Sequence, residues 1–81
     1  MRLLFTTHFH RAYKKAPKDI QLAFDKQSLL LLQDLRHPSL HAKKYSEAED
    51  KWQARVTGAW RFYFRIINDA YVVTDIIRHP K

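Results

Sequence analysis

The sequence predicts an α+β fold in which a β-α-α unit precedes an antiparallel β meander, with both helices packed on one face of the sheet. Apolar residues recur at spacings of three and four over residues 7–36, which is typical of helices. From residue 42 onward they alternate with polar residues, which is typical of strands. The chain has 81 residues, enough for one small core but too few for two. We therefore expect residues 1–81 to form a single domain.

The first half of the chain supplies the first strand and the two helices. Residues 2–6 carry three consecutive apolar side chains and predict a short strand. Thr7 is expected to cap a first helix over residues 7–15. A proline suits the first position of a helix, so the second helix is expected over residues 17–36, before Pro38 stops it.

Four consecutive leucines, Leu29–Leu32, surround one turn of the second helix. A single contact with a sheet needs a narrower apolar stripe than this. The additional leucines either meet the first helix in a helical hairpin or leave a groove open for a helix of a partner.

The second half of the chain predicts the meander. Residues 42–45, 52–56, 60–67 and 71–78 are the expected strands, and residues 46–51 form a charged loop between the first two. The sheet has one face left for solvent or a ligand if both helices cover the other.

The alternation over residues 60–67 decides which side chains lie on this open face. Arg61, Tyr63 and Arg65 alternate with apolar residues and are therefore placed there. Residues that face each other across a ladder share a face, so the preceding hairpin needs a three-residue loop, which pairs Arg55 with Arg61. A two-residue loop would instead pair Arg55 with an apolar core residue.

The last hairpin extends the open face. A three-residue loop over residues 68–70 places Asp75 opposite Tyr63, and His79 has the same parity. Two arginines directly opposite each other repel by up to about 1 kcal/mol, so an anion bound between them is one explanation of the pair. The other is that one arginine forms a surface ion pair with Asp75 or Glu49. The side chains gathered on one concave face would be Arg55, Arg61, Tyr63, Asp75 and His79.

The composition indicates a polyanionic partner. Fifteen Lys and Arg against eight Asp and Glu give a net charge of +7, which favours nucleic acid first, an acidic protein second and anionic lipid third. No cysteine is present, so disulfides and thiolate zinc sites are excluded.

The apolar start is too short for a signal peptide or a membrane span, and we expect a cytoplasmic protein. His8 and His10 are two apart on the first helix and point in different directions. His37 and His41 flank a proline and lack further ligands, so neither a metal nor another cofactor is expected.

Residues 51–66 read Lys-Trp-Gln-Ala-Arg-Val-Thr-Gly-Ala-Trp-Arg-Phe-Tyr-Phe-Arg-Ile, and the final apolar strand ends Ile77-Arg78-His79. In order and spacing these residues resemble the RelE/ParE superfamily of toxins from bacterial and archaeal toxin–antitoxin modules. The first half agrees with the usual β-α-α opening of that superfamily, so the likeness covers nearly the whole chain. The residues that agree there are Phe9, Tyr13, Lys14, the helix start at Pro17 and the leucine-bearing helix.

The resemblance to RelE-like members implies an endoribonuclease that cuts mRNA on the ribosome without a metal, by attack of a ribose 2′-OH on the adjacent phosphate. It implies that Arg61 stabilises the phosphate charge with Arg55 beside it, and that His79 acts as an acid or a base. Its implied partners are a cognate antitoxin, the ribosome and mRNA. The expected RNA-binding residues are Lys43, Lys44, Tyr63, Arg65 and Lys81.

The sequence also departs from the superfamily pattern. Some members end in a tyrosine that positions the cut nucleotide, whereas this chain ends Pro80-Lys81; Tyr63 or Tyr71 are the candidates to replace it. No carboxylate stands clearly at the general-base position that some members use, and Glu47, Glu49 and Asp75 all stay open. ParE-like members inhibit DNA gyrase with the same fold, so a gyrase inhibitor and an inactive RNA- or antitoxin-binding module are the alternatives.

Overall fold

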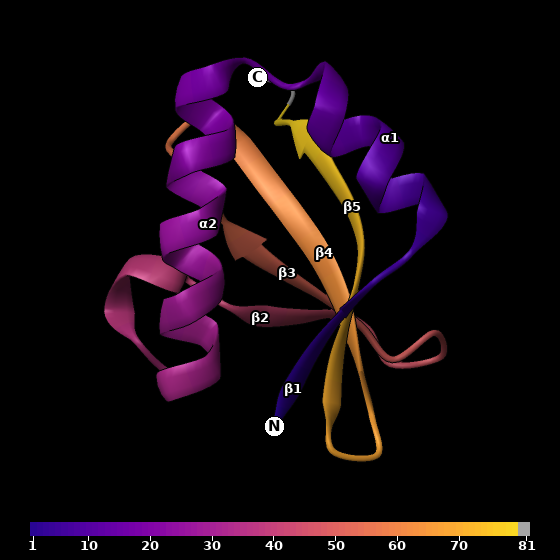
Figure 1. Cartoon of the computed structure of the whole chain (residues 1–81). Coiled ribbons are helices and arrows are strands. Elements are labelled where there is room, and N and C mark those ends of the chain that lie inside the picture. The colour runs from indigo at the N-terminus through magenta and orange to yellow at the C-terminus, as the bar shows by residue number, and fades with distance from the viewer. Residues whose placement is uncertain (80–81) are drawn as a thin grey trace.

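A computed structural model describes residues 1–79. Five strands form one sheet in the order β1-β5-β4-β3-β2. Strand β1 runs parallel to β5, and all other neighbours are antiparallel. Both helices lie on one face of the sheet (Figure 1), as the sequence predicts. The elements are β1 (Arg2–Phe5), α1 (Thr7–Lys15), α2 (Lys18–Gln33), the 3₁₀ turn η1 (Pro38–Leu40), β2 (Lys43–Ser46), β3 (Lys51–Arg55), β4 (Trp60–Ile67) and β5 (Ala70–Arg78).

The N-cap of helix α1 lies one residue earlier than the sequence predicts. Thr6, and not Thr7 as expected, is the N-cap, and its hydroxyl accepts a hydrogen bond from the Phe9 N–H at 3.1 Å. The same hydroxyl donates to the carbonyl of Thr74 on β5 at 3.3 Å. The cap therefore also fastens the start of α1 to the sheet.

Helix α2 is shorter than the sequence predicts. Pro17 is its N-cap and precedes the first helical residue. The helix ends at Gln33, three residues before the expected end, because Asp34 is extended with φ −161°. The Asp34 carboxylate then accepts a hydrogen bond from the Arg36 N–H at 2.9 Å, a local bond that competes with continuation of a helix.

The core lies between the helices and the inner face of the sheet. Its largest fully buried side chains are Phe62 and Phe64 of β4, Val73 of β5, Leu31 of α2 and Leu40 of η1. The Phe24 ring of α2 meets Phe62 edge-on, with 5.1 Å between ring centroids.

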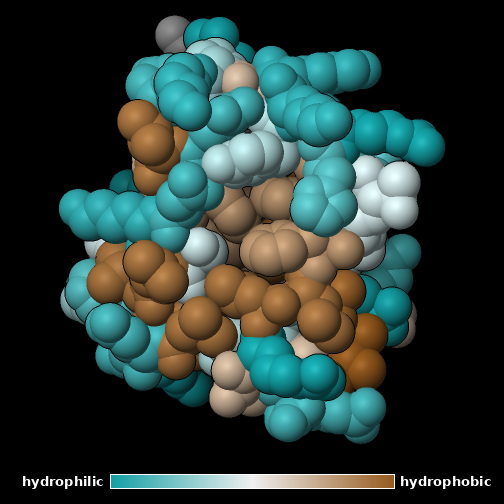
Figure 2. All heavy atoms as spheres, viewed as in Figure 1, coloured by the Kyte–Doolittle hydropathy of each residue, from teal (hydrophilic) through white to brown (hydrophobic). Residues whose placement is uncertain are grey.

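Helix α1 does not cover the whole leucine run, because two of the four leucines are exposed. Leu31 is fully buried, but Leu29 is 60% exposed and Leu32 is 37% exposed. Leu22, two turns before Leu29 on the same side of α2, is also exposed. In Figure 2, which shares the view of Figure 1, apolar residues accordingly reach the surface along α2 and around β1. No helix within residues 1–79 is long and apolar enough to cross a membrane.

The β3–β4 hairpin has the predicted register. Ala54 pairs with Phe62 and Arg55 pairs with Arg61. Strand β4 has the predicted bounds, while β2, β3 and β5 differ from the expected ranges by one residue at one or both ends. Within the β2–β3 pair, Lys44 faces Trp52 and Ser46 faces Lys51, so the residue between them, Tyr45, is bulged.

The β4–β5 hairpin has a shorter loop than predicted. Ile67 pairs with Ala70, which leaves a two-residue loop of Asn68 and Asp69 in place of the expected three residues. Asn68 adopts φ 54° there. A bulge at Thr74 then shifts the register by one, so that Tyr63 faces Asp75 as predicted.

Candidate functional site

A pocket of about 390 Å³ opens on the sheet face that the helices leave free. It lies at the end of the sheet where β3 turns into β4. No acidic residue of the described chain lines it. The lining residues are His41, Ala42, Lys43, Gln53, Arg55, Arg61 and His79. The pocket is therefore cationic, and it unites the three residues, Arg55, Arg61 and His79, for which the family resemblance implies catalytic roles.

The turn between β3 and β4 fixes the Arg61 side chain. Its Nη1 group donates to the carbonyls of Thr57 at 2.7 Å, Trp60 at 3.0 Å and Gly58 at 3.2 Å. Burial, and then the charge of Arg55, lower the pKa of the Arg61 guanidinium from its ordinary value. The group still carries its charge at neutral pH. Partial desolvation strengthens its attraction for an anion.

Arg55 faces Arg61 across the ladder and has an unused donor. Its Nε atom is buried and finds no hydrogen-bond acceptor within residues 1–79. In the same part of the chain neither arginine forms an ion pair with an acidic residue, so the surface pairing with Asp75 or Glu49 is not seen. A buried donor without a partner is costly.

His79 is held beside the same turn by its backbone. The His79 N–H donates to the carbonyl of Ala59 at 2.6 Å. This bond joins the end of β5 to the residue two positions before Arg61. His79 is exposed and lines the pocket with both arginines.

His41 is a pocket residue that the sequence reasoning assigned only to a possible metal pair. It follows η1 in a left-handed conformation, with φ 45° and ψ 42°, and its N–H bonds to the carbonyl of Pro38. The preceding Leu40 is fully buried and anchors the segment. His37, the other member of that pair, lies next to Ser39, whose N–H donates to the His37 Nδ1 atom. No group of three potential metal ligands is found among the described residues.

The two neighbouring lysines separate. Lys43 pairs with Gln53 and lines the pocket. Lys44 lies on the opposite face of β2, beside Trp52, and its ammonium contacts Asp50 at 3.0 Å and Glu47 at 3.4 Å. Hydrogen bonds to these two carboxylates raise the pKa of Lys44. The structure therefore brings Lys43 and not Lys44 to the pocket.

Tyr63 and Arg65 lie farther along the open face. The Tyr63 hydroxyl accepts a hydrogen bond from the Gln53 side chain at 3.4 Å. The Lys51 ammonium lies 4.9 Å from the Tyr63 ring centroid and 5.9 Å from that of Tyr45, which is 61% exposed. Arg65 lines a separate pocket with Glu49, Lys51 and Thr74. This part of the open face therefore holds two cations and two aromatic rings beside one carboxylate, that of Glu49.

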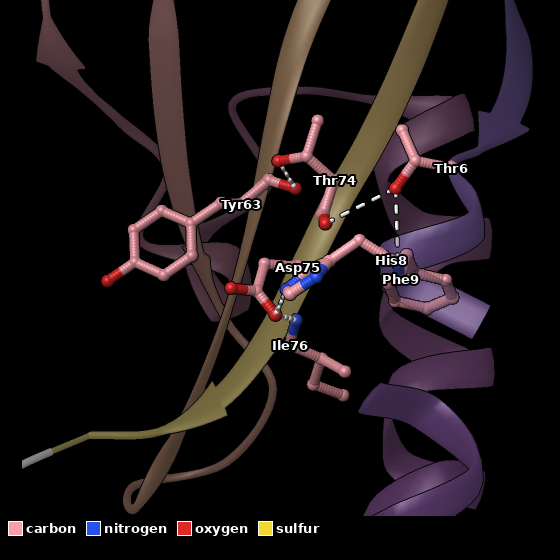
Figure 3. Close-up of polar contacts among 7 residues, drawn as sticks. All are labelled: Thr6, His8, Phe9, Tyr63, Thr74, Asp75 and Ile76. Atoms are coloured by element: carbon pink, nitrogen blue, oxygen red, sulfur yellow. Dashed lines mark hydrogen bonds and ion pairs between the residues drawn. The ribbon is translucent and has the colours of Figure 1, made fainter. Parts of the chain in front are cut away.

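Asp75 does not join the arginines, contrary to the expected gathering of five side chains. It faces Tyr63 in the ladder, but its carboxylate accepts from the Ile76 N–H at 2.9 Å and pairs with the His8 ring of α1 at 3.3 Å. Figure 3 shows Asp75 beside His8, with the Tyr63 ring pointing away from both. Strand β1 pairs with β5 only as far as Val73, so the carboxylate reaches around a free edge.

Lys81, the last expected RNA contact, lies outside the described residues.

Comparison with solved structures identifies the fold. No protein-family model matches the chain, and no curated protein matches it. A solved YoeB/ParE toxin from Agrobacterium tumefaciens superposes with a TM-score of 0.81 at 14% identity, over 99% of this chain and 100% of that one. The chain has the fold of the RelE/ParE toxins. The resemblance inferred from the sequence is thus confirmed at the level of the fold.

Two further solved structures extend this likeness. One, a RelBE2 toxin–antitoxin complex from Mycobacterium tuberculosis, matches with a TM-score of 0.78 at 22% identity, over 96% of each chain. Another, YafQ from E. coli, matches with a TM-score of 0.78 at 15% identity, over 96% of this chain and 93% of that one. The RelE/ParE fold thus accommodates very different sequences, so the role of each pocket residue has to be argued from this chain.

Proposed function

We propose that this chain is the toxin of a toxin–antitoxin module and that it cleaves mRNA on the ribosome. The fold supports the general class. The observation that carries the ribonuclease assignment is the facing pair Arg55 and Arg61, which lines the pocket with no acidic neighbour in the described lining. A phosphodiester is an anion that fits such a pair.

The pocket suits attack of a ribose 2′-OH on the adjacent phosphate. The transition state carries additional negative charge on the phosphoryl oxygens, and preorganised cations stabilise it more than the ground state. Arg61 is preorganised because three carbonyls hold its guanidinium. Arg55 supplies the second cation, and His79 transfers a proton.

The rest of the open face suits single-stranded RNA. Lys51 and Arg65 continue the cationic surface beyond the pocket. Tyr45 is exposed beside Tyr63, and exposed aromatic rings on a basic surface stack unpaired bases. Tyr71, one candidate for the missing terminal tyrosine, is buried against Phe64 in the core and is unavailable for this role.

We also propose a cognate antitoxin as the protein partner. The solved structures that match this chain include RelB–RelE complexes from Methanococcus jannaschii and Pyrococcus horikoshii. A partner with acidic residues would neutralise the cationic face and block RNA. Such a toxin would act in the cytoplasm, where ribosomes and mRNA are found.

Arg61→Ala tests the proposed function. We expect about a 100- to 1,000-fold loss of cleavage, which is typical when one preorganised donor is removed. Cleavage is mapped by primer extension on a reporter mRNA under translation. Arg78→Ala is the matched control, because Arg78 lies opposite Trp60 and so faces away from Arg61 in the same hairpin.

Three outcomes would contradict the proposal. Cleavage by Arg61→Ala at the wild-type rate would remove Arg61 from the site. Intact mRNA with wild-type protein, together with inhibited supercoiling by DNA gyrase in a parallel assay, would replace the ribonuclease with a gyrase inhibitor. Neither effect, with tight binding of an acidic partner, would leave an inactive binding module.

A further inference from the structure

We propose that His41 is a second proton-transfer residue, and that His41 and His79 divide the two proton transfers of RNA cleavage between them. The inference rests on the proposed ribonuclease function and deepens it. The sequence leaves the general base open among the carboxylates of Glu47, Glu49 and Asp75. None of the three lies in the pocket lining.

The chemistry needs two proton-transfer groups. One base accepts the proton of the 2′-OH, and one acid donates a proton to the leaving 5′ oxygen. Histidine is the side chain whose ordinary pKa lies near neutral pH, so it performs either task. The other ionisable groups of the described lining, Lys43, Arg55 and Arg61, are cations suited to holding the phosphate. His41 and His79 are thus the two proton carriers of the lining.

The fold holds the backbone of His41 in place. The buried Leu40 precedes it, and the His41 N–H closes η1 on the Pro38 carbonyl at 3.3 Å. The buried amide of Gln27 donates both to the Ser39 carbonyl at 3.1 Å and to the Arg55 carbonyl at 2.9 Å. The segment that carries His41 is therefore tied to the strand that carries Arg55.

The left-handed conformation of His41 is a second sign that its position is determined by its surroundings. Its φ is 45°, in a left-handed region that few residues other than glycine adopt, although histidine is one of the types found there more often than most. Such conformations persist where neighbouring contacts enforce them, and they concentrate at functional sites.

In the proposed cleavage, each bond formed is matched by a bond broken, and each proton has a donor and an acceptor. One imidazole takes the proton from the 2′-OH as the O2′–P bond forms, and the other imidazolium gives a proton to O5′ as the P–O5′ bond breaks. The products are a 2′,3′-cyclic phosphate and a 5′-hydroxyl end. Arg55 and Arg61 stay on the phosphoryl oxygens throughout.

The first experiment is His41→Gly with added imidazole. Glycine adopts a positive φ without strain, so the backbone is retained while the proton carrier is lost. We expect a 100- to 10,000-fold loss of cleavage, of the order found for general acid–base residues, and partial recovery in imidazole buffer. Arg61→Ala should show no imidazole response. His10→Ala, on the exposed side of α1, should cleave like the wild type.

The second experiment separates the two histidines. The substrate is an mRNA with a bridging 5′-sulfur at the mapped cut, because a thiolate leaves without a proton. One of the variants His41→Gly and His79→Gly should recover on this substrate, and the other should not. His41→Asn, which also tolerates a positive φ, repeats the test in a second background, and thermal unfolding followed by circular dichroism verifies that each variant is folded.

The outcomes distinguish this inference from the function on which it rests. If Arg61→Ala is inactive but His41→Gly and His41→Asn cleave normally, only the role of His41 is overturned. If both histidine variants recover on the sulfur substrate, or if neither does, the assignment of one proton transfer to each histidine is also overturned. If the wild-type protein leaves mRNA intact, the ribonuclease function and this inference both fail.

Discussion

Gln27 shows how one buried side chain organises the pocket from behind. It belongs to α2 and is 7% exposed. Its amide nitrogen donates to carbonyls of η1 and of β3, so three elements meet at one group. Two backbone carbonyls accept from this buried side chain, and leaving such a polar group without a partner costs about 1–3 kcal/mol.

Gln27→Met should therefore destabilise the protein by about 1–3 kcal/mol, because methionine fills a similar volume but donates no hydrogen bond. Equilibrium unfolding in urea measures the change. Gln33→Met, at the exposed end of the same helix, serves as the control and should change stability by less than about 0.5 kcal/mol. Equal stability of the two variants would show that the Gln27 bonds contribute nothing.

Single residues also show where sequence reasoning is limited. The alternation of β4 was enough to predict that Arg55 faces Arg61, because strand parity is a local property. The position of His41 was not predictable in this way, because it depends on a 3₁₀ turn anchored by buried contacts from α2. Asp75 was predicted at the correct position of β5, but its carboxylate turns around the edge of that strand to pair with His8. This edge is free only because β1 ends at Phe5.

At the scale of elements, two departures from the predicted β4–β5 hairpin offset each other. With its two-residue loop and no bulge, the ladder would pair Asp75 with the fully buried Phe62. Burying a carboxylate there would be costly. The bulge at Thr74 restores Ile76 opposite Phe62. The register at the pocket end was therefore correct although the loop length was wrong, because both arrangements satisfy the same apolar pattern.

The leucine run of α2 gives a test within one helix turn. Leu31 is fully buried and Leu29 is 60% exposed. Leu31→Ala should cost about 2–5 kcal/mol through lost burial and a cavity. Leu29→Ala should change stability by less than about 0.5 kcal/mol, since it removes little buried surface. Chemical denaturation of both variants measures the contrast. Comparable losses would mean that Leu29 is covered in the folded protein.

On the scale of the whole molecule, the two sheet faces differ in character. The helices cover one face with an apolar core. The open face carries part of the +7 net charge around two pockets, one of which also includes Glu49. The cations of this face are Lys43, Lys51, Arg55, Arg61 and Arg65. Under the proposed function, RNA binds from one side of the sheet, so position on a face should matter more than charge alone.

Lys43 and Lys44 test that asymmetry, because they are neighbours on opposite faces of β2. Binding of a single-stranded RNA with 2′-O-methyl groups, which blocks cleavage, is measured against salt concentration. Each phosphate contact adds about 0.7 to the steepness of the logarithmic salt dependence for single strands. Lys43→Ala should reduce the slope by about that amount. Lys44→Ala should leave it unchanged, because Glu47 and Asp50 already neutralise its ammonium on the far side. Equal reductions would mean that RNA responds only to total charge and that the open face is not its binding surface.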